Sequence, residues 1–581
     1  MKKAVDRDEF RALFADQAIV FTRLPAGRER DLAARANEQS GRGDGSLHTV
    51  AELDVLFTQL LAEGQESSPL RLIGPDGRPT AAGTAVGSYS SVALTKDEFF
   101  AAPMYLVQVT GWPEDAPTLK GPVDAPVGAQ LSLWPIAHDD QRAAPPPDGA
   151  GVLFATSSFA LANTGNRTLD VPKRSWRANV TAGKGARFVG MSRLNFKAMY
   201  NDPSQMREAL AWRLFARAAV PASRHGYTRL TINGRYRGLY SIIEDIDRRY
   251  LHDRFGDNDR GNLYKASCGH LGCATLERRA GPDGDDSGRQ YRAPADNPTY
   301  DLRTDTDDPA ANGFEDLAGL IRAIDGTGLP DGDARFTTDA FRDRLQEILN
   351  VHAFLRWAGV NILLGSWDNY FATPSNYFLY NSGRRGAAHD VTNSPYFTFL
   401  PWDYDNTFGI DYFDTAWQYT DLIDWPGNTV NYCRENHAPH RTSRIPLVQN
   451  LLRSPDFLRY YLDHLEYLLD TDVNPGAITA AIGPDGGGLW DRVLQSAYLE
   501  SDTPHGAPHT GRQFSNDEVY LANAKQNELH RPDTTVQAIT HYVRMRYDRA
   551  REQFAVLRRE HPRGASGVHF PVDLEPLPGR A

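Results

Sequence analysis

Apolar residues recur every three or four positions in two early segments, residues 9–17 and 50–63, and this spacing predicts amphipathic helices. From residue 66 the pattern changes to short runs rich in β-branched and aromatic residues, such as MYLVQVTGW, between Gly and Pro turns. Such runs predict strands. The sequence therefore indicates an accessory region over residues 1–145, helical over 1–65 and β-rich over 66–142, which ends in a proline-rich linker.

Residues 150–248 predict a strand-rich lobe with one strong helix. We expect strands at 152–162, 174–180 and 192–197, and the helix in MREALAWRLFARAA, after the capping sequence Asp202-Pro203-Ser204. Two more apolar strands follow, joined by the pair Asn233-Gly234, which is typical of a tight hairpin turn. This order of elements is that of a small lobe that covers a nucleotide.

Residues 249–565 predict a mainly helical second lobe, followed by a tail over 566–581. Helical periodicity is strong in 314–324, 337–364, 445–454, 455–471 and 536–560, and we predict 337–364 as one helix. A segment rich in Gly and Asp at 279–313 predicts an exposed insertion with little regular structure. Together these patterns indicate an α+β fold with two lobes after the accessory region.

Charge and cysteine content narrow the functional classes. The net charge of -11 argues against a nucleic-acid-binding protein. No apolar run approaches the roughly 20 residues that span a bilayer, and the first residues do not form a secretory signal, so we expect a cytoplasmic protein. Three cysteines are too few for a disulfide framework and favour a reducing compartment. Cys268 and Cys273 bracket His270, which fits either half of a metal site or a small disulfide loop.

Carboxylate and amide side chains cluster in two short segments with apolar flanks, GSWDNYFATPSN and PWDYDN. Asp368, at the end of a helix, is a candidate general base, and Asn376 is a candidate metal ligand. Asp405 is favoured over Asp403 as the principal metal ligand, because it leads into a turn where the backbone can bend. Oxygen ligands of this kind suit Mg²⁺ or Mn²⁺ with a bound nucleotide. The alternative is that Asp403 and Asp405 only cap a turn at the surface.

Several charged residues are candidates for ATP binding. Lys197 ends a strand before the capped helix, and Glu208 on that helix could pair with it. The alternative is a surface lysine and a first-turn glutamate that the helix dipole favours. Arg207 and Lys265 are further candidates for contact with the nucleotide.

The adenine base has two candidate neighbours. Glu244 to Ile246 directly follow an apolar strand, where a hinge backbone would meet adenine; the alternative is an acidic loop after an edge strand. Trp402 and Tyr404 flank the acids of the second segment, and each could stack on a base or pack the strand.

Six segments occur together in one order, namely KRSWRANV, LNFKAMYNDPSQMREALAWRLF, RLTINGRYRGLYSIIEDID, RFGDNDRGNLYK, LLGSWDNYFATPSNYFLY and FLPWDYDNTFGID. With them the chain resembles the CotH family of atypical kinases over about residues 173–411. The resemblance implies a divergent, two-lobed protein-kinase-like fold that binds ATP and magnesium and phosphorylates Ser or Thr of proteins. It also implies that Asp368 is the catalytic aspartate and Asp405 the metal-binding one. The chain departs from protein kinases in having no loop of the form GxGxxG.

We therefore expect a kinase that depends on Mg-ATP and acts on a protein substrate, without a nucleic-acid partner or a transmembrane segment. Two other functions stay open. A kinase-like fold could use ATP for adenylylation or amino-acid ligation, because a fold does not fix the group that is transferred. It could also serve as a scaffold for binding or adhesion. The sequence leaves the acceptor and the oligomeric state open.

Overall fold

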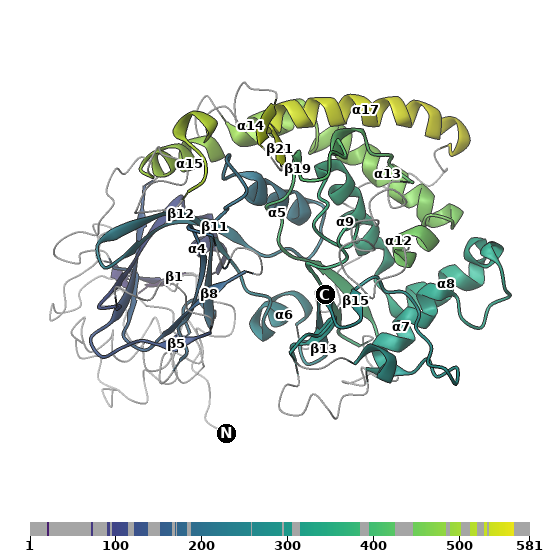
Figure 1. Ribbon diagram of the computed structural model, residues 1–581, viewed down its shortest axis with the longest axis horizontal. Helices are drawn as coiled ribbons and strands as arrows, with labels where there is room; N and C mark the ends of the chain where they lie inside the picture. The colour runs from purple at the N-terminus through teal and green to yellow at the C-terminus, as the bar shows by residue number, and fades with distance from the viewer. Residues whose placement is uncertain are drawn as a thin grey trace. The chain divides into compact units, whose positions relative to one another are not determined.

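The computed structural model (Figure 1) describes residues 96–113, 121–137, 152–165, 169, 171–182, 187–256, 258–292, 296–304, 314–383, 394–424, 445–483, 488–500, 512–519 and 534–562, and the backbone of the strands at 20–22, 71–73, 90–92 and 528–531. The chain divides into two compact units. The first unit holds Met1–Tyr200, Arg224–Asp245 and Arg492–Ser515, and the second holds Asn201–Ser223, Ile246–Asp491 and Asn516–Ala581. The helices predicted at 9–17 and 50–63 lie outside the described residues.

The first unit is built on a nine-stranded sheet in the order β5-β8-β9-β10-β12-β11-β4-β6-β7. Its strands are β4 (Met104–Thr110), β5 (Val123–Asp124), β6 (Gln130–Ile136), β7 (Phe154–Thr156), β8 (Ala160–Thr164), β9 (Ser175–Asn179), β10 (Arg193–Lys197), β11 (His225–Ile232) and β12 (Arg235–Ile243). Neighbouring strands are antiparallel except β4 and β11, which are parallel. A smaller sheet contains β1 (Val20–Thr22), β2 (Arg71–Ile73) and β3 (Ser90–Val92). Helix α4 (Lys96–Ala101) directly precedes β4.

Apolar side chains of these strands form the core of the first unit. Phe99, Val107, Leu131 and Leu194 are all fully buried within one cluster. The predicted hairpin is present as β11 and β12, which lie side by side (Figure 1), and both turn residues, Asn233 and Gly234, have positive φ as that turn requires. Strands β4 and β6 come from the predicted accessory region, so this sheet crosses the boundary that we predicted near residue 150.

The second unit combines helices with a four-stranded antiparallel sheet in the order β16-β13-β17-β18. The strands are β13 (Asn262–Ala266), β16 (Tyr300–Leu302), β17 (Tyr377–Asn381) and β18 (Phe397–Pro401). The helices are α5 (Arg207–Arg217), α6 (Arg248–Phe255), α7 (Glu315–Asp325), α8 (Asp339–Ile348), α9 (Val351–Leu364), α12 (Pro446–Leu451), α13 (Pro455–Thr471), α14 (Pro475–Ile482) and α17 (Ile539–Glu560), and α15 (Leu489–Tyr498) bridges the division between the units in sequence. Short pieces complete the unit: β14 (Cys268–Gly269), β15 (Gly272–Cys273), β19 (Ile410–Asp411), β20 (Glu528–Arg531), β21 (Thr534–Gln537), η3 (Gly288–Tyr291), η4 (Asp333–Thr337) and η5 (Trp417–Tyr419).

Helix α9 is the central helix of this unit, because it is apolar almost all round and packs against α5, α13, α17 and β18. The single helix predicted over 337–364 is in fact two helices, α8 and α9. They are separated because the Asn350 N–H donates to Phe397 O on β18 (2.8 Å), while Asn350 Oδ1 caps α9 by accepting from the Ala353 N–H (3.1 Å). A tertiary strand contact therefore overrides continuous helical periodicity.

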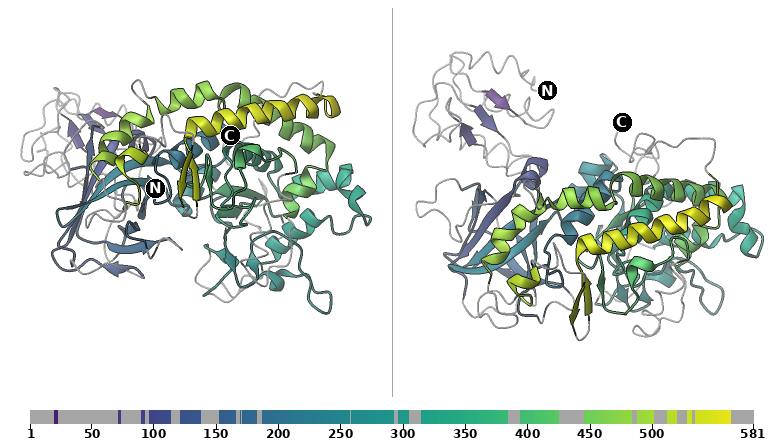
Figure 2. Two further views of the ribbon diagram at one scale, coloured as in Figure 1. Left: turned by 45° about the horizontal axis from the view of Figure 1, so that its top comes forward. Right: turned by 90° about the horizontal axis from the view of Figure 1, so that it is seen from above.

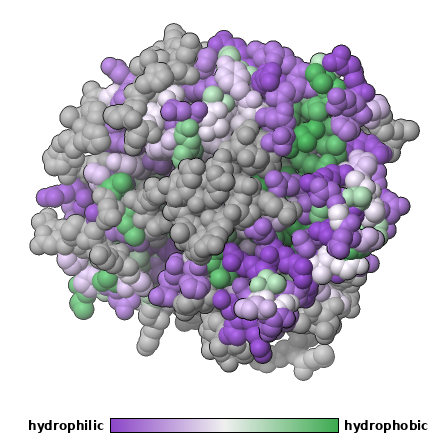
Figure 3. Space-filling model, turned by 45° about the vertical axis from the view of Figure 1, so that its right-hand side comes forward, coloured by the Kyte–Doolittle hydropathy of each residue, from purple (hydrophilic) through white to green (hydrophobic). Residues whose placement is uncertain are grey.

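The described residues thus form an α+β fold, as predicted. The segment 279–313, which we predicted to have little regular structure, contains strand β16 and the short η3 helix. These elements form because their residues Tyr291, Tyr300 and Leu302 are buried. Among the described residues, no helix is both long enough and apolar enough to cross a bilayer. Hydrophilic residues cover most of the coloured surface in the view of Figure 3, with smaller hydrophobic areas between them.

Candidate functional site

The two acidic segments lie at one edge of the four-stranded sheet. In the register of this sheet Ala266 of β13, Tyr377 of β17 and Pro401 of β18 lie side by side. Asn376 directly precedes Tyr377, and Asp403 follows Pro401 by two residues. The sheet therefore brings both predicted metal-binding segments to one edge, although 27 residues separate these two side chains in sequence.

Asp368 lies in the turn that follows α9, where we expected it. The helix ends at Gly365, whose φ of 58° is left-handed, a conformation that glycine adopts without cost. Asp368 is half-buried, and both of its carboxylate oxygens accept hydrogen bonds: Oδ1 from the Thr373 hydroxyl (2.8 Å) and Oδ2 from Asn406 Nδ2 (3.1 Å). Asn376 Nδ2 donates to the backbone carbonyl of Asp368 (3.0 Å). Two predicted site residues, Asp368 and Asn376, are therefore in direct contact.

The turn that carries Asp368 rests on a buried amide pair. Asn369 Nδ2 donates to Asn361 Oδ1 (2.9 Å) and to Ser366 Oγ (2.7 Å), and Asn369 Oδ1 accepts from the Phe371 N–H (3.1 Å). Both amides are fully buried. Because buried polar groups are costly to leave without partners, this network favours a single conformation of the turn.

The second acidic segment leaves the end of β18 as a loop. Asp403 and Asp405 lie beyond the strand, so strand alternation does not decide which way their side chains face. Asp403 (φ 65°) and Asn376 (φ 52°) both adopt the left-handed region, which Asp and Asn tolerate better than most residues and which is enriched at functional sites. Tyr404 between the acids is fully buried and its hydroxyl accepts from Trp357 Nε1 (2.6 Å), so it packs the core instead of stacking on a base. Burial also raises the pKa of the Tyr404 hydroxyl well above its ordinary value.

The side chains at this edge carry oxygen atoms of the type that magnesium prefers. Asp403, Asp405 and Asn376 are half-buried and offer hard oxygen ligands. Within the described residues, no group of three or more His, Cys, Asp and Glu side chains could hold a metal ion. Magnesium usually takes one or two carboxylates together with phosphate oxygens and water, and the binding of Mg-ATP by these residues stays a prediction.

Two of the predicted adenine-contacting residues belong to one apolar cluster of the second unit. Ile246 is buried and Trp402 is half-buried, and both pack with Tyr250, Phe378 and other buried residues. Trp402 meets Phe378 edge-to-face, with 5.8 Å between ring centroids. The predicted packing role of Trp402 is therefore confirmed. Contact of adenine with Ile246 or with the exposed part of the Trp402 ring stays a prediction.

Three charged candidates occupy separate positions. Lys265 is half-buried on β13, where its backbone pairs with Phe378 of β17. Glu208 is buried on α5, and its Oε1 accepts from the Tyr404 N–H (3.4 Å) in the acidic loop. Lys197 is half-buried at the end of β10 in the first unit. The pairing of Lys197 with Glu208 and the contact of Lys265 with the nucleotide stay predictions.

Arg207 does not have the position that phosphate binding requires. Its side chain is fully buried. Its guanidinium forms an ion pair with Asp202, and Nε donates to Thr407 O (3.1 Å). A guanidinium held in this way supports the loop after Asp405 and is not accessible to ATP in this conformation, so we leave Arg207 out of the nucleotide site.

The side chain of Glu244 also has a structural role, because it is held in ion pairs within the first unit. It is buried, and its Oε1 lies 3.0 Å from Lys96 Nζ and 2.8 Å from Arg224 Nη1. Its backbone N–H donates to Arg224 O (3.0 Å). The chain passes from the first unit to the second between Asp245 and Ile246, and the hinge role of this segment stays a prediction.

Two residues contact Asp368 that we did not predict to do so: Thr373, to which we gave no role, and Asn406, which we placed only within the acidic segment. Asn406 also accepts from Asn201 Nδ2 (3.3 Å), which lies at the start of the second unit's first segment. Asn406 is next to Asp405 in PWDYDN, and the sequence therefore indicated its place in the acidic segment. Nothing in the pattern around Thr373 distinguishes it from a loop threonine.

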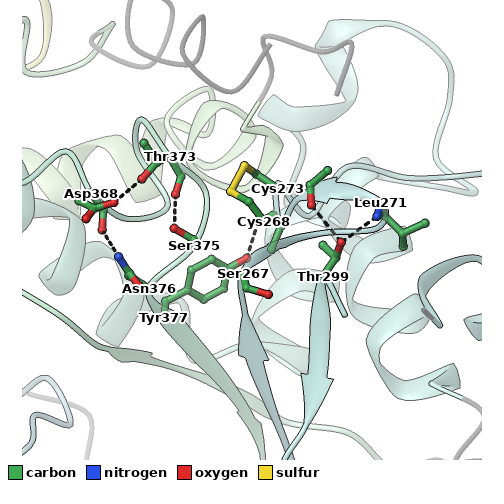
Figure 4. The surroundings of a disulfide bond; sticks show 12 residues. Ser267, Cys268, Leu271, Cys273, Thr299, Asp368, Thr373, Ser375, Asn376 and Tyr377 are labelled. Carbon is green, nitrogen blue, oxygen red and sulfur yellow. Dashed lines mark hydrogen bonds between the residues drawn. A yellow bond between two sulfur atoms is a disulfide. The ribbon is translucent and has the colours of Figure 1, made fainter. Parts of the chain in front are cut away.

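A disulfide lies beside the same loop (Figure 4). Cys268 and Cys273 are bonded to each other across the β14–β15 hairpin, which is one of the two alternatives for this pair. The next residue, Ala274, donates its N–H to Pro374 O (2.7 Å) and accepts from the Tyr377 hydroxyl (2.5 Å). The hairpin is thus tied to the segment that runs from Asp368 to β17. Disulfides are rare in the cytosol, so this bond does not fit our expectation of a reducing compartment.

Comparison with known proteins agrees with the motifs. A family model described as CotH kinase protein matches residues 161–483, which is more than half of the chain. The chain is 25% identical over 254 residues to Inner spore coat protein H of Bacillus subtilis (strain 168), an alignment that covers 43% of this chain and 59% of that protein.

Two proteins of Rhizopus delemar are also similar. Invasin CotH2 is 25% identical over 262 residues, covering 44% of this chain and 38% of that protein, and Invasin CotH3 is 24% identical over 311 residues, covering 52% and 44%. The chain therefore spans between about two fifths and three fifths of the length of these relatives.

Proposed function

Because the chain belongs to the CotH family, we propose that it is a protein kinase that depends on Mg-ATP and transfers the γ-phosphoryl group to Ser or Thr of a protein. The proposal includes a divergent kinase-like arrangement in which the predicted strand-rich and helical lobes bind the nucleotide. The main support is the contact of Asp368 with Asn406 and Asn376, which brings the two acidic segments together at one sheet edge.

In this proposal Asp368 orients the acceptor hydroxyl and takes its proton. The Thr373 hydroxyl and Asn406 amide each use one lone pair of a different carboxylate oxygen. Together these two hydrogen bonds fix the orientation of the carboxylate group. Fixing the carboxylate in this way is useful because phosphoryl transfer depends mainly on positioning and electrostatics.

Asp405 would hold the metal ion, with Asn376 or Asp403 in support. When bound, Mg²⁺ neutralises charge on the phosphate oxygens. The left-handed backbone at Asp403 and Asn376 supports this part of the proposal, because such conformations are enriched at functional sites. Lys197, Lys265 and Glu208 are the proposed polar contacts to the nucleotide, and Ile246 and Trp402 the apolar ones.

A second candidate function is adhesion, since two relatives are named invasins. Together with the spore-coat name of the third relative, this also favours association with a surface. The disulfide between Cys268 and Cys273 points in the same direction, because such bonds persist in oxidising surroundings. We therefore propose a surface-associated or exported protein in place of the cytoplasmic location that we predicted.

The test is to incubate the protein and a mixture of acceptor proteins with Mg²⁺ and ATP labelled on either the α or the γ phosphate. We expect transfer of the γ label only, and loss of transfer in Asp368→Asn and in Asp405→Asn. Transfer of the α label would show adenylylation. Binding of an acceptor or surface without transfer of either label would favour the adhesion function.

A further inference from the structure

We infer that Arg207 is a positioning residue for the metal-binding loop, and that it acts by joining this loop to the C-terminal strand β21. The inference deepens the proposed function and rests on it. It assigns a role in the site to residues 534–537, which lie beyond the family match at 161–483.

Arg207 connects three separate parts of the second unit. Its own backbone N–H donates to Asp202 Oδ2 (2.9 Å), and its guanidinium pairs with the same carboxylate, which fixes the first turn of α5. Nε donates to Thr407 O (3.1 Å), and Nη2 donates to Gln537 O (2.5 Å). The side chain is fully buried, so its charge depends on these partners.

Thr407 is the residue through which Arg207 reaches the site. It follows Asn406, whose amide holds Asp368 Oδ2 (3.1 Å), and it lies two residues after Asp405. The next residue, Phe408, donates its N–H to Leu364 O at the end of α9 (2.8 Å). The loop is therefore fixed by Arg207 and by α9 on consecutive residues directly after its ligands.

The C-terminal strand closes the other side of this arrangement. β21 pairs with β19, which directly follows the loop, and the Gln537 N–H donates to Gly409 O (3.0 Å). A Cβ on Gly409 would lie 2.8 Å from Gln537 Cβ, and its φ of +86° also requires glycine. Figure 2 shows the β20–β21 hairpin, in dark yellow, at the start of α17. Contact this close leaves little freedom for the loop to move independently of β21.

Only arginine can make this set of contacts. Its planar guanidinium donates in several fixed directions, whereas a lysine ammonium is a compact charge on a flexible stem. Arg207→Lys keeps the charge beside Asp202 but cannot reach both carbonyls in the same geometry. We therefore expect this variant to fold and to hold the loop less firmly.

The experiment measures ATP binding as a function of Mg²⁺ concentration in the full chain. We expect Arg207→Lys to raise the Mg²⁺ concentration for half-maximal binding by about 10-fold or more, the cost typical of changing a residue that supports metal ligands. The matched control is Arg356→Lys, because Arg356 is also fully buried and donates to a backbone carbonyl (Ala219 O, 3.2 Å). This control should lower the melting temperature without changing the Mg²⁺ dependence.

The outcomes separate the inference from the function on which it rests. If the parent chain binds ATP and Arg207→Lys has the same Mg²⁺ dependence, or Arg356→Lys shifts it equally, the inference is wrong. If the parent does not bind ATP at any Mg²⁺ concentration, the proposed function is wrong. If Arg207→Lys does not fold, Gly409→Ala decides, because it disturbs the same loop against β21 with Arg207 intact and must also raise the Mg²⁺ requirement.

Discussion

Replacing Asn369 by alanine tests whether the turn that carries Asp368 depends on its buried amide pair. The change removes hydrogen bonds to Asn361 Oδ1 (2.9 Å) and from the Phe371 N–H (3.1 Å), and both amides are fully buried. Each buried polar group that loses its bond costs about 1–3 kcal/mol. We therefore expect Asn369→Ala to lower the free energy of unfolding by about 2–6 kcal/mol and to weaken phosphoryl transfer.

Urea denaturation followed by tryptophan fluorescence measures this loss, and Trp357 and Trp367 lie in the same region. Asn450→Ala is a matched control, because Asn450 is a buried asparagine of the same unit whose side-chain amide donates to Ile324 O (2.8 Å). It should cost about 1 kcal/mol and leave ATP binding unchanged. A loss below about 1 kcal/mol for Asn369→Ala, or normal transfer in the variant, would refute the reasoning.

Three further variants have defined outcomes. Asn406→Ala removes the amide that donates to Asp368 Oδ2 (3.1 Å). Hydrogen bonds to charged groups contribute about 1.5–3 kcal/mol, so kcat should fall by about 10-fold or more with little change in ATP affinity. An unchanged kcat would contradict this prediction. Replacing Cys268 and Cys273 by serine should cost ~2 kcal/mol of stability and equal the effect of reductant on the parent; a parent insensitive to reductant would show that the bond does not form. Burial lowers the pKa of His464 to about 3 from its ordinary 6.5, so between these pH values only the unfolded state binds the proton, and the free energy of unfolding should fall as pH drops below 6.5. His464→Gln should show a shallower fall of stability with pH, and an equal slope would exclude His464 as the cause.

Local patterns predicted the elements around the site well. The hairpin at Asn233 and Gly234 was predictable because a two-residue turn needs positive φ at both positions. The placement of Asp368 just after a helix was predictable from apolar periodicity, and the Gly365 cap agrees with it. These features depend on neighbouring residues only, and the sequence contains that information directly.

Features that depend on distant partners were not predictable. Arg207 was a candidate for contact with the nucleotide, yet its backbone acceptors are Thr407 and Gln537, far along the chain. Glu244 is held by Lys96 in the same way. The pairing of β4 with β11 also joins segments far apart in sequence, which no local pattern encodes.

The central claim is that this chain binds Mg-ATP through Asp405 at the sheet edge that carries Asp368. It is tested most directly by calorimetric titration of ATP into the parent, Asp405→Ala and Asp368→Ala chains, each with and without Mg²⁺. The account predicts binding by the parent only with Mg²⁺, loss of that binding in Asp405→Ala, and its retention in Asp368→Ala. Absence of binding by the parent with Mg²⁺, or undiminished binding by Asp405→Ala, would contradict the account.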